Sequence, residues 1–199
     1  GTQSGTVGTA VSLQISASDP DGDSLTFAAS GLPPGLSIGT GSGLISGTPT
    51  AVGSFAVTVQ VSDAAATNSV NFDWTISDAG APTIAITVPT AAATYATETS
   101  PLTLGGTASD NVAVTQVTWS NDRGGSGTAT GTSNWTTSGI ALQSGQNVLT
   151  VTARDGAGNT ATDMLTVTYT PPDTTAPVVT ITSPTSAATF ATSATPMSL

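Results

Sequence analysis

Lysine, histidine and cysteine are absent from this chain of 199 residues, and its only positive side chains are Arg123 and Arg154. Twelve acidic residues oppose them and leave a net charge of −10. Such a chain cannot form the basic patch that binds nucleic acid or an anionic membrane surface. The absence of cysteine excludes disulfides and thiolate chemistry. Without lysine or histidine, most schemes for general-base catalysis and nucleophile activation lose their components, so we expect a protein that is not an enzyme.

Charged and aromatic residues are also scarce, at 7% and 5% of the chain. A typical soluble domain is about one quarter charged, so serine and threonine supply the polarity here. The low aromatic content predicts cores built mostly from valine, isoleucine, leucine and alanine. No apolar run approaches the length of a membrane span, and we expect no membrane insertion in this segment. The composition favours a location outside the cell.

Apolar and polar residues alternate along the chain, and no stretch shows helical periodicity. Clear examples of alternation are residues 11–15, 55–61, 70–76, 148–151 and 165–169. Clusters of glycine, proline, asparagine and aspartate separate these runs. Alternation implies sheets with one buried and one wet face. The sequence therefore predicts an all-β protein of antiparallel sandwiches, with no helices of note.

Residues 78–104 and 173–199 are two copies of one segment, aligned without a gap at an offset of 95 residues. A period near this length suits one small β-sandwich per repeat. We place a first unit at residues 1–78, a second unit at 79–170, and the linker and first strands of a third at 171–199. The junctions are short and contain proline, which makes them stiff. We expect this chain to be a slice of a longer tandem array.

Five segments of the first unit carry a resemblance to a known family. They read VGTAV at 7–11, ASDPDGDSLTF at 17–27, GLPPGLSI at 31–38, ISGTP at 45–49 and VQVSD at 59–63. The unit resembles the putative-Ig, or dystroglycan-type cadherin-like, module of bacterial surface proteins. Such modules usually open with another strand before the position of Gly1, so we expect this unit to lack its first edge strand.

The second unit resembles a bacterial Ig-like repeat through GTASDN at 106–111 and VTARDGAGN at 151–159. Together the two resemblances imply tandem Ig-like β-sandwiches with Greek-key connections. They also imply an extracellular repeat protein, usually adhesive or structural and sometimes appended to a polysaccharide-acting enzyme. The bacterial cell surface or its surroundings is the location that follows from them.

The first candidate metal site is the turn that holds Asp19, Asp21 and Asp23. Three carboxylates at alternate positions suit a hard, oxygen-seeking ion such as Ca²⁺. In an Ig-like sandwich Asp63 would lie in a loop at the same pole, so four carboxylates could converge there. The alternative is an ordinary capped turn, because aspartate and glycine are common turn residues and no glutamate closes an EF-hand pattern.

A second candidate metal site lies where the first unit joins the second. Its side chains are Asp78 of the entering linker and, from two loops of the second unit, Asp110, Asn111, Asp155 and Asn159. These groups could form a calcium site that stiffens the joint. The alternative is that Arg154 pairs with Asp110 or Asp155, while Asn159 only occupies a left-handed turn position.

The three tryptophans bear on sugar binding. Trp74 and Trp119 are in phase with apolar neighbours and are expected in the core. Trp135, between Asn134 and Thr136, is expected to be exposed, and it is the one plausible platform for a glycan. A single exposed tryptophan is weak support for a carbohydrate-binding role.

These features favour a non-catalytic structural or adhesive repeat segment of an extracellular bacterial surface, matrix or filament protein, with calcium at its loop and inter-domain sites. The alternative is a carbohydrate-binding or spacer module attached to a secreted polysaccharide-acting enzyme. The expected partners are neighbouring repeats or identical subunits, and glycans. Two strands alone are marginal in water, so residues 176–199 could complete a neighbouring subunit by strand donation.

Overall fold

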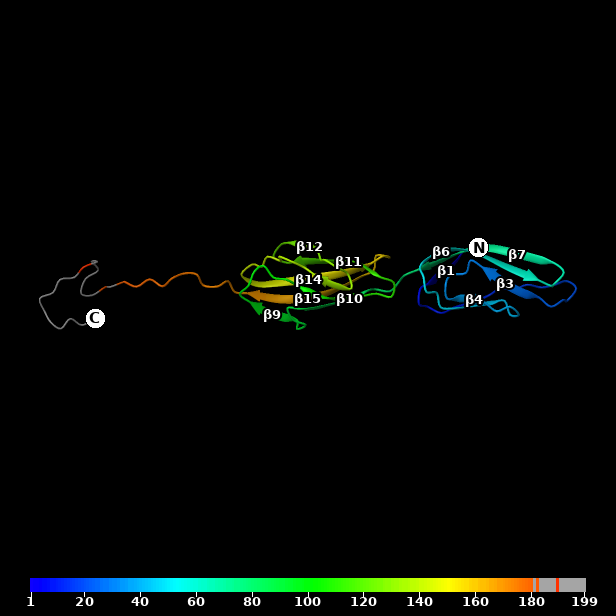
Figure 1. Ribbon diagram of the computed structural model, residues 1–199, viewed down its shortest axis with the longest axis horizontal. Coiled ribbons are helices and arrows are strands. Elements are labelled where there is room, and N and C mark those ends of the chain that lie inside the picture. Colours follow the sequence, from blue (N-terminus) through cyan, green and yellow to red (C-terminus); the bar gives the residue numbers. More distant parts are fainter. Residues whose placement is uncertain (181, 183–188, 190–199) are drawn as a thin grey trace.

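The computed structural model describes residues 1–180, 182 and 189, and these form two β-sandwiches that lie end to end (Figure 1). Every regular element among the described residues is a strand, which confirms the all-β prediction. The expected strands of a third repeat fall on residues 171–199, most of which lie outside the described residues. Residues 171–180 are described, and they are exposed and form no strand.

The first unit contains a four-stranded sheet of order β1-β7-β6-β3 and a three-stranded sheet of order β2-β5-β4. Strand β1 runs parallel to β7, and the other paired strands are antiparallel. The strands are β1 (Gln3–Thr6), β2 (Val11–Gln14), β3 (Thr26–Ser30), β4 (Leu36–Ile38), β5 (Leu44–Gly47), β6 (Gly53–Ser62) and β7 (Thr67–Ser77).

The second unit has a five-stranded sheet of order β12-β11-β14-β15-β9 and a three-stranded sheet of order β13-β10-β8. Here β9 runs parallel to β15, as β1 does to β7 in the first unit. The strands are β8 (Thr83–Val88), β9 (Thr94–Thr97), β10 (Gly105–Ser109), β11 (Val114–Asn121), β12 (Ser126–Thr128), β13 (Asn134–Thr136), β14 (Gly145–Asp155) and β15 (Thr160–Tyr169).

Each sandwich closes around its own apolar core, made by the inward residues of alternating strands. In the first unit Trp74 and Ile76 of β7 pack with Ile45, Val57 and Val59. The larger core of the second unit gathers side chains from both sheets, including Leu104, Leu149, Val151, Leu165 and Val167. The alternation in the sequence therefore reports which face of each strand is buried.

Trp135 corrects an expectation, because it is 3% exposed and lies in the core of the second unit. Gly106 on β10 lies opposite it, and a Cβ at that glycine would stand 2.6 Å from the tryptophan ring. The missing side chain of Gly106 therefore makes room for the indole. Trp74 is buried as expected, while Trp119 is half-buried and packs against the core.

Replacing Leu149 by alanine is expected to destabilise the second unit by about 2–5 kcal/mol, because it leaves a cavity at a fully buried position. The matched control is Met164→Ala on the adjacent strand, where the side chain is 59% exposed and its loss should have little effect. Urea denaturation followed by circular dichroism measures both. Equal effects of the two substitutions would contradict the core described here.

Candidate functional site

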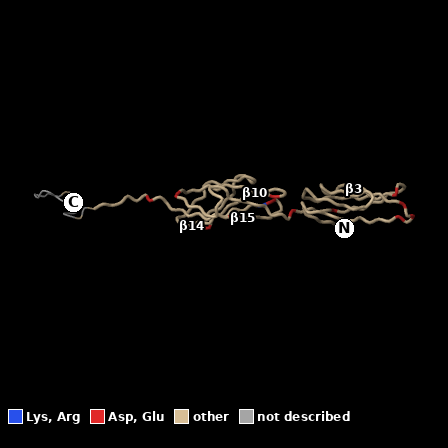
Figure 2. The backbone as a smooth tube through the Cα atoms, turned by 90° about the horizontal axis from the view of Figure 1, so that it is seen from below, with Lys and Arg blue, Asp and Glu red and all other residues tan. Residues whose placement is uncertain are grey.

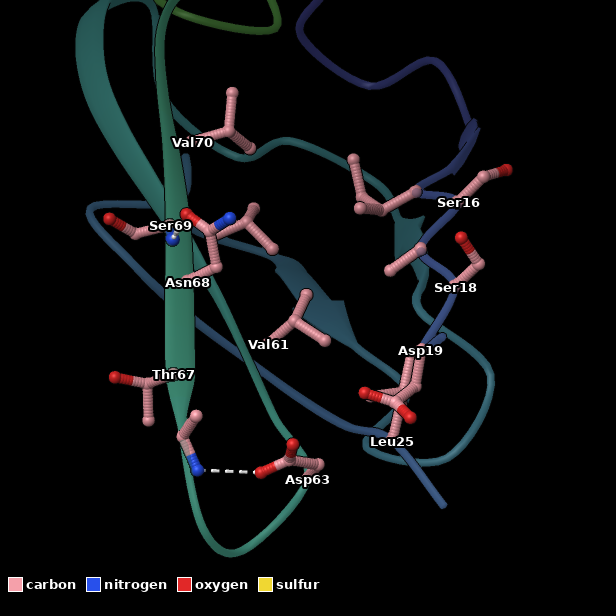
Figure 3. A pocket seen from close by; sticks show the side chains of 14 residues that line it. Ser16, Ser18, Asp19, Leu25, Val61, Asp63, Thr67, Asn68, Ser69 and Val70 are labelled. Atoms are coloured by element: carbon pink, nitrogen blue, oxygen red, sulfur yellow. Dashed lines mark hydrogen bonds between the residues drawn. The ribbon is translucent and has the colours of Figure 1, made fainter. Parts of the chain in front are cut away.

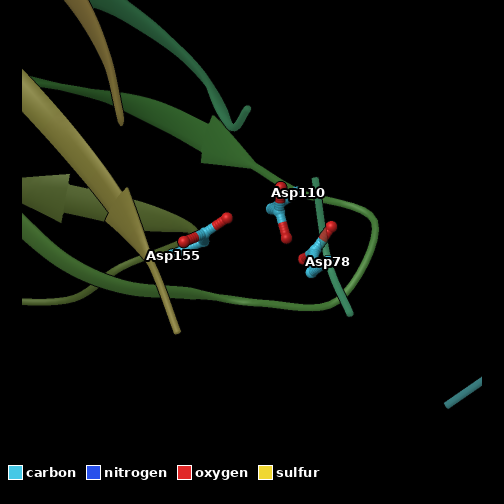
Figure 4. Close-up of side chains that lie close together, drawn as sticks. All are labelled: Asp78, Asp110 and Asp155. Atoms are coloured by element: carbon cyan, nitrogen blue, oxygen red, sulfur yellow. The ribbon is translucent and has the colours of Figure 1, made fainter. Parts of the chain in front are cut away.

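Three carboxylates meet where the linker from the first unit enters the second (Figure 4). Asp78 directly follows β7, Asp110 directly follows β10, and Asp155 ends β14. One carboxylate oxygen from each residue lies within 4.8 Å of the other two. Asp155 is buried and the other two are half-buried. The structure thus brings together the three aspartates that the sequence placed at the joint.

Asp110 has one oxygen engaged and one free. Its Oδ1 accepts hydrogen bonds from the backbone amides of Val112 and Ala113, at 2.9 and 3.0 Å, which caps the loop between β10 and β11. Its Oδ2 is buried and accepts no hydrogen bond. An unpaired buried carboxylate oxygen is costly. This atom is the strongest indication in the site that a positively charged partner belongs there.

Asp155 is held by the loop between β14 and β15. Its Oδ1 accepts hydrogen bonds from the backbone amides of Gly158 and Asn159, and its Oδ2 accepts one from Asn159 Nδ2 at 2.7 Å. Burial tends to raise the pKa of Asp155, but hydrogen bonds from Asn159, Gly158 and Ala157 outweigh it and hold the pKa below its usual value. The side chain is therefore a carboxylate at neutral pH.

Asp78 and the linker are tied to the second unit by asparagines. Asp78 Oδ1 accepts hydrogen bonds from the Gly80 amide at 2.9 Å and from Asn111 Nδ2 at 3.1 Å. The amide of Asn159 reaches across to the linker and donates to the carbonyl of Gly80 at 2.9 Å and to that of Asp78 at 3.4 Å. Asn159 thus binds both the linker and Asp155, a role that its reading as a simple turn residue missed.

The arrangement suits a divalent cation with oxygen ligands. Calcium holds its oxygens at about 2.3–2.6 Å, so two oxygens on one ion can be separated by at most about 5 Å. The three carboxylates meet that condition. Their hydrogen bonds come from backbone amides and asparagine side chains, and Arg154 supplies none of them. The alternative in which Arg154 neutralises the cluster therefore finds no support among these contacts.

The first candidate site has a different geometry. Asp19 Oδ1 accepts the backbone amides of Asp21 and Asp23, at 2.8 and 3.1 Å, so this carboxylate caps its own turn. Asp21 and Asp23 are exposed. Asp63 caps the turn between β6 and β7, and hydrogen bonds from the amides of Ala66 and Ala65 lower its pKa.

The four carboxylates of this first candidate do not converge as expected. Within the described chain, the group of three or more acidic residues close enough for one ion is the one at the joint. Of the four, Asp19 and Asp63 line a common groove, whereas Asp21 and Asp23 are not among its lining residues. Figure 2 shows acidic residues both at the far end of the first unit and at the joint.

Comparison with protein families confirms the resemblances. Residues 1–77 match the family described as "Putative Ig domain", and residues 82–151 match "Bacterial Ig domain". The two units are therefore Ig-like repeats, a class that is generally non-catalytic, and bacterial Ig domains typically occur in extracellular surface proteins. In a comparison with curated proteins, nothing matches the chain by sequence.

Several solved structures match the chain at low sequence identity. Drosophila N-cadherin EC1-4 is 9% identical, with 85% of this chain and 47% of that chain covered and a TM-score of 0.42. A family 107 endo-fucoidan hydrolase is 17% identical, with 86% and 28% covered and a TM-score of 0.37. Fibronectin(III)-like modules of Clostridium thermocellum CbhA are 16% identical, with 85% and 90% covered and a TM-score of 0.39.

This chain thus spans less than half of the length of the first two of these structures. TM-scores below 0.5 are too low to assign the chain a function. No helix among the described residues has the length and apolar character needed to cross a membrane.

Replacing Asn159 by alanine is expected to destabilise the second unit by about 1–3 kcal/mol, because Asp155 and the linker carbonyls lose a partly buried partner. Asn111→Ala is the control, since it removes one hydrogen bond from an exposed asparagine beside the same cluster. Thermal unfolding in chelator compares the two variants. A loss no larger for Asn159→Ala than for Asn111→Ala would show that Asn159 does not hold the joint.

Proposed function

Because its two units match the putative Ig and bacterial Ig families, we propose that this chain is a non-catalytic structural segment of an extracellular bacterial protein, stiffened by calcium at the joint. One observation carries the calcium part of the proposal. Three carboxylates from the linker and two loops lie within reach of one ion, and one of their oxygens is buried without a partner. A divalent cation would neutralise this cluster and satisfy that oxygen.

A cation bound here would act on the geometry of the rod. Asp78 belongs to the linker, while Asp110 and Asp155 belong to the second unit. An ion held by all three would therefore fix the direction in which the linker enters the second unit. Without the ion, the carboxylates repel one another at short range. Stiff tandem units are what a surface protein needs to hold a distal binding domain away from the cell.

The chain would serve the same spacer role beside a secreted enzyme domain. The elongated arrangement of the two sandwiches fits either setting (Figure 1). A sugar-binding role is less well supported, because Trp74 and Trp135 are buried and Trp119 is half-buried against the core. The three tryptophans therefore offer no flat, exposed pair on which a sugar ring could stack.

Calcium is expected to raise the melting temperature of the second unit. A ligand at about 100 times its dissociation constant stabilises a folded domain by about 2.7 kcal/mol, which corresponds to about 10 °C or more for a domain of this size. Calorimetry with CaCl₂ and with chelator measures the shift. Asp110→Asn keeps the shape of the side chain, and it should abolish most of the effect.

Asp73→Asn is the matched control for this experiment, because it removes one negative charge from an exposed position on β7 away from the joint. It should leave the calcium shift unchanged. A melting temperature that is the same in calcium and in chelator would contradict the site. Equal calcium shifts in melting temperature for Asp110→Asn and Asp73→Asn would also contradict the site.

Small-angle X-ray scattering tests the effect on shape. With calcium we expect a narrower distribution of angles between the two units, because the ion joins the linker to both loops. Removal of calcium should broaden the distance distribution without unfolding either sandwich. Identical scattering curves in calcium and chelator would contradict the stiffening role even if the ion binds.

A further inference from the structure

The two sandwiches share most of their strand pairings, since β1-β7-β6-β3 corresponds to β9-β15-β14-β11 and β5-β2 corresponds to β13-β10. They differ at sheet edges, and one of these differences concerns β2. In the second unit β10 lies between β13 and β8. In the first unit its counterpart β2 pairs with β5, and no strand among the described residues pairs with its other side. The correspondence continues past β2, since residues 16–19 read SASD where residues 107–110 read TASD. The edge that β8 covers in the second unit is therefore open in the first.

Residues beside this edge are more exposed in the first unit than their counterparts in the second, as expected where no strand covers them. Ala108, under β8, is 5% exposed, while its counterpart Ala17 is exposed. Asp163 lies opposite Val151 and accepts a hydrogen bond from the Ile86 amide of β8 at 2.8 Å. The residue at the same place in the first unit is Val70, opposite Val59, and it is 48% exposed. An exposed valine thus stands where a neighbouring strand is bound in the second unit.

This edge forms a groove of about 570 Å³. Its apolar lining includes Ile15, Ala17, Leu25, Val59, Val61 and Val70. Figure 3 shows the groove between residues 16–19 on one side and residues 67–70 on the other, with Asp19 and Asp63 near one end. An apolar floor beside an unpaired strand edge is the form of site that takes an added β-strand.

The same chain carries a strand of the required type. Residues 177–183 read PVVTITS and follow β8 and its flanking residues, 82–88 (PTIAITV), by 95 positions. Val178 and Val179 are 91% and 93% exposed, and residues 177–180, which the structure describes, form no strand. Figure 1 places residues 177–180 and the first unit at opposite ends of an elongated molecule. We propose that residues 177–183 of a second copy add in this groove along residues 14–18, which begin at the last residue of β2, as β8 adds to β10.

The pairing of β8 with β10 predicts the register of the added strand. Thr83 pairs with Ser109, Ile84 with Ala108 and Ala85 with Thr107. The donated strand follows β8 by 95 residues, and residues 16–19 of the acceptor align with residues 107–110. The donated residues Val178, Val179 and Thr180 therefore fall opposite Ser18, Ala17 and Ser16. Ile84 is half-buried and packs on the core, so Val179 faces the groove. Thr83 is exposed, so Val178 faces solvent.

This contact joins one end of a molecule to the opposite end of the next, so it is heterologous and builds an open chain of copies. Asp173 follows Asp78 by 95 residues, and the donated segment would bring it to Asp19 and Asp63, the counterparts of Asp110 and Asp155. Calcium should then strengthen the association. This last step rests on the proposed function, whereas the docking of the strand does not.

Sedimentation velocity of the full chain, in physiological salt and from micromolar to millimolar concentration, tests the proposal. The average mass of the wild-type protein should rise with concentration. Val179→Asp places a charge in the groove and should abolish the rise, while Val178→Asp, the same change on the solvent side, should retain it. A wild-type protein that stays monomeric throughout would overturn the proposal, as would equal behaviour of the two variants.

Disulfide trapping tests the register, because the chain has no cysteine of its own. Ser18→Cys and Val178→Cys variants, mixed and oxidised, should give a disulfide-linked heterodimer. Ser138→Cys, an exposed residue of the second unit, replaces Ser18→Cys as the control and should give several-fold less. Equal yields would overturn the register.

Both experiments are run in calcium and in chelator. Association that is the same in the two buffers would contradict the role of Asp173 and leave the strand docking in place. If a cation is shared between the two copies, they should associate in calcium and lose this association in chelator.

Discussion

The joint depends on how buried carboxylates are satisfied. Asp155 is 1% exposed, and in that position a charged side chain persists only if donors surround it. Two backbone amides and Asn159 provide these donors. Asp110 has two amide donors on one oxygen and none on the other. The balance is therefore complete for Asp155 and incomplete for Asp110, and the proposed cation would supply the partner that Asp110 lacks.

Satisfying the carboxylates also fixes the linker. The amide of Asn159 donates to Asp155 and to the linker carbonyl of Gly80, so the group that holds the buried charge also holds the incoming chain. A Cβ at Gly80 would require the Asn111 side chain, which donates a hydrogen bond to Asp78, to move. The side chain of Asn159 therefore both satisfies the buried carboxylate of Asp155 and holds the short linker against the second unit.

Alternation in the sequence predicted the fold because each strand has one wet and one buried face. Residues 148–151 and 165–169 show this, and both lie in long paired strands. The same rule did not identify Trp135 as buried, since its burial depends on the missing side chain of Gly106 across the sheet. The joint could be predicted as a set of residues from loop topology. The role of Asn159 could not, because it depends on the position of a linker carbonyl 79 residues away in the chain.

The repeated segment does not begin where a sandwich begins. Its first copy starts at the linker aspartate, Asp78, and continues through β8, the first strand of the following sandwich. Asp78 of the joint and β8, the strand that covers the edge of β10, are therefore carried on one piece of chain. Binding of that strand places the aspartate at the pole, and the proposed cation would hold the start of the strand there. Each event favours the other, so a sandwich that accepts this piece gains its edge and its joint together.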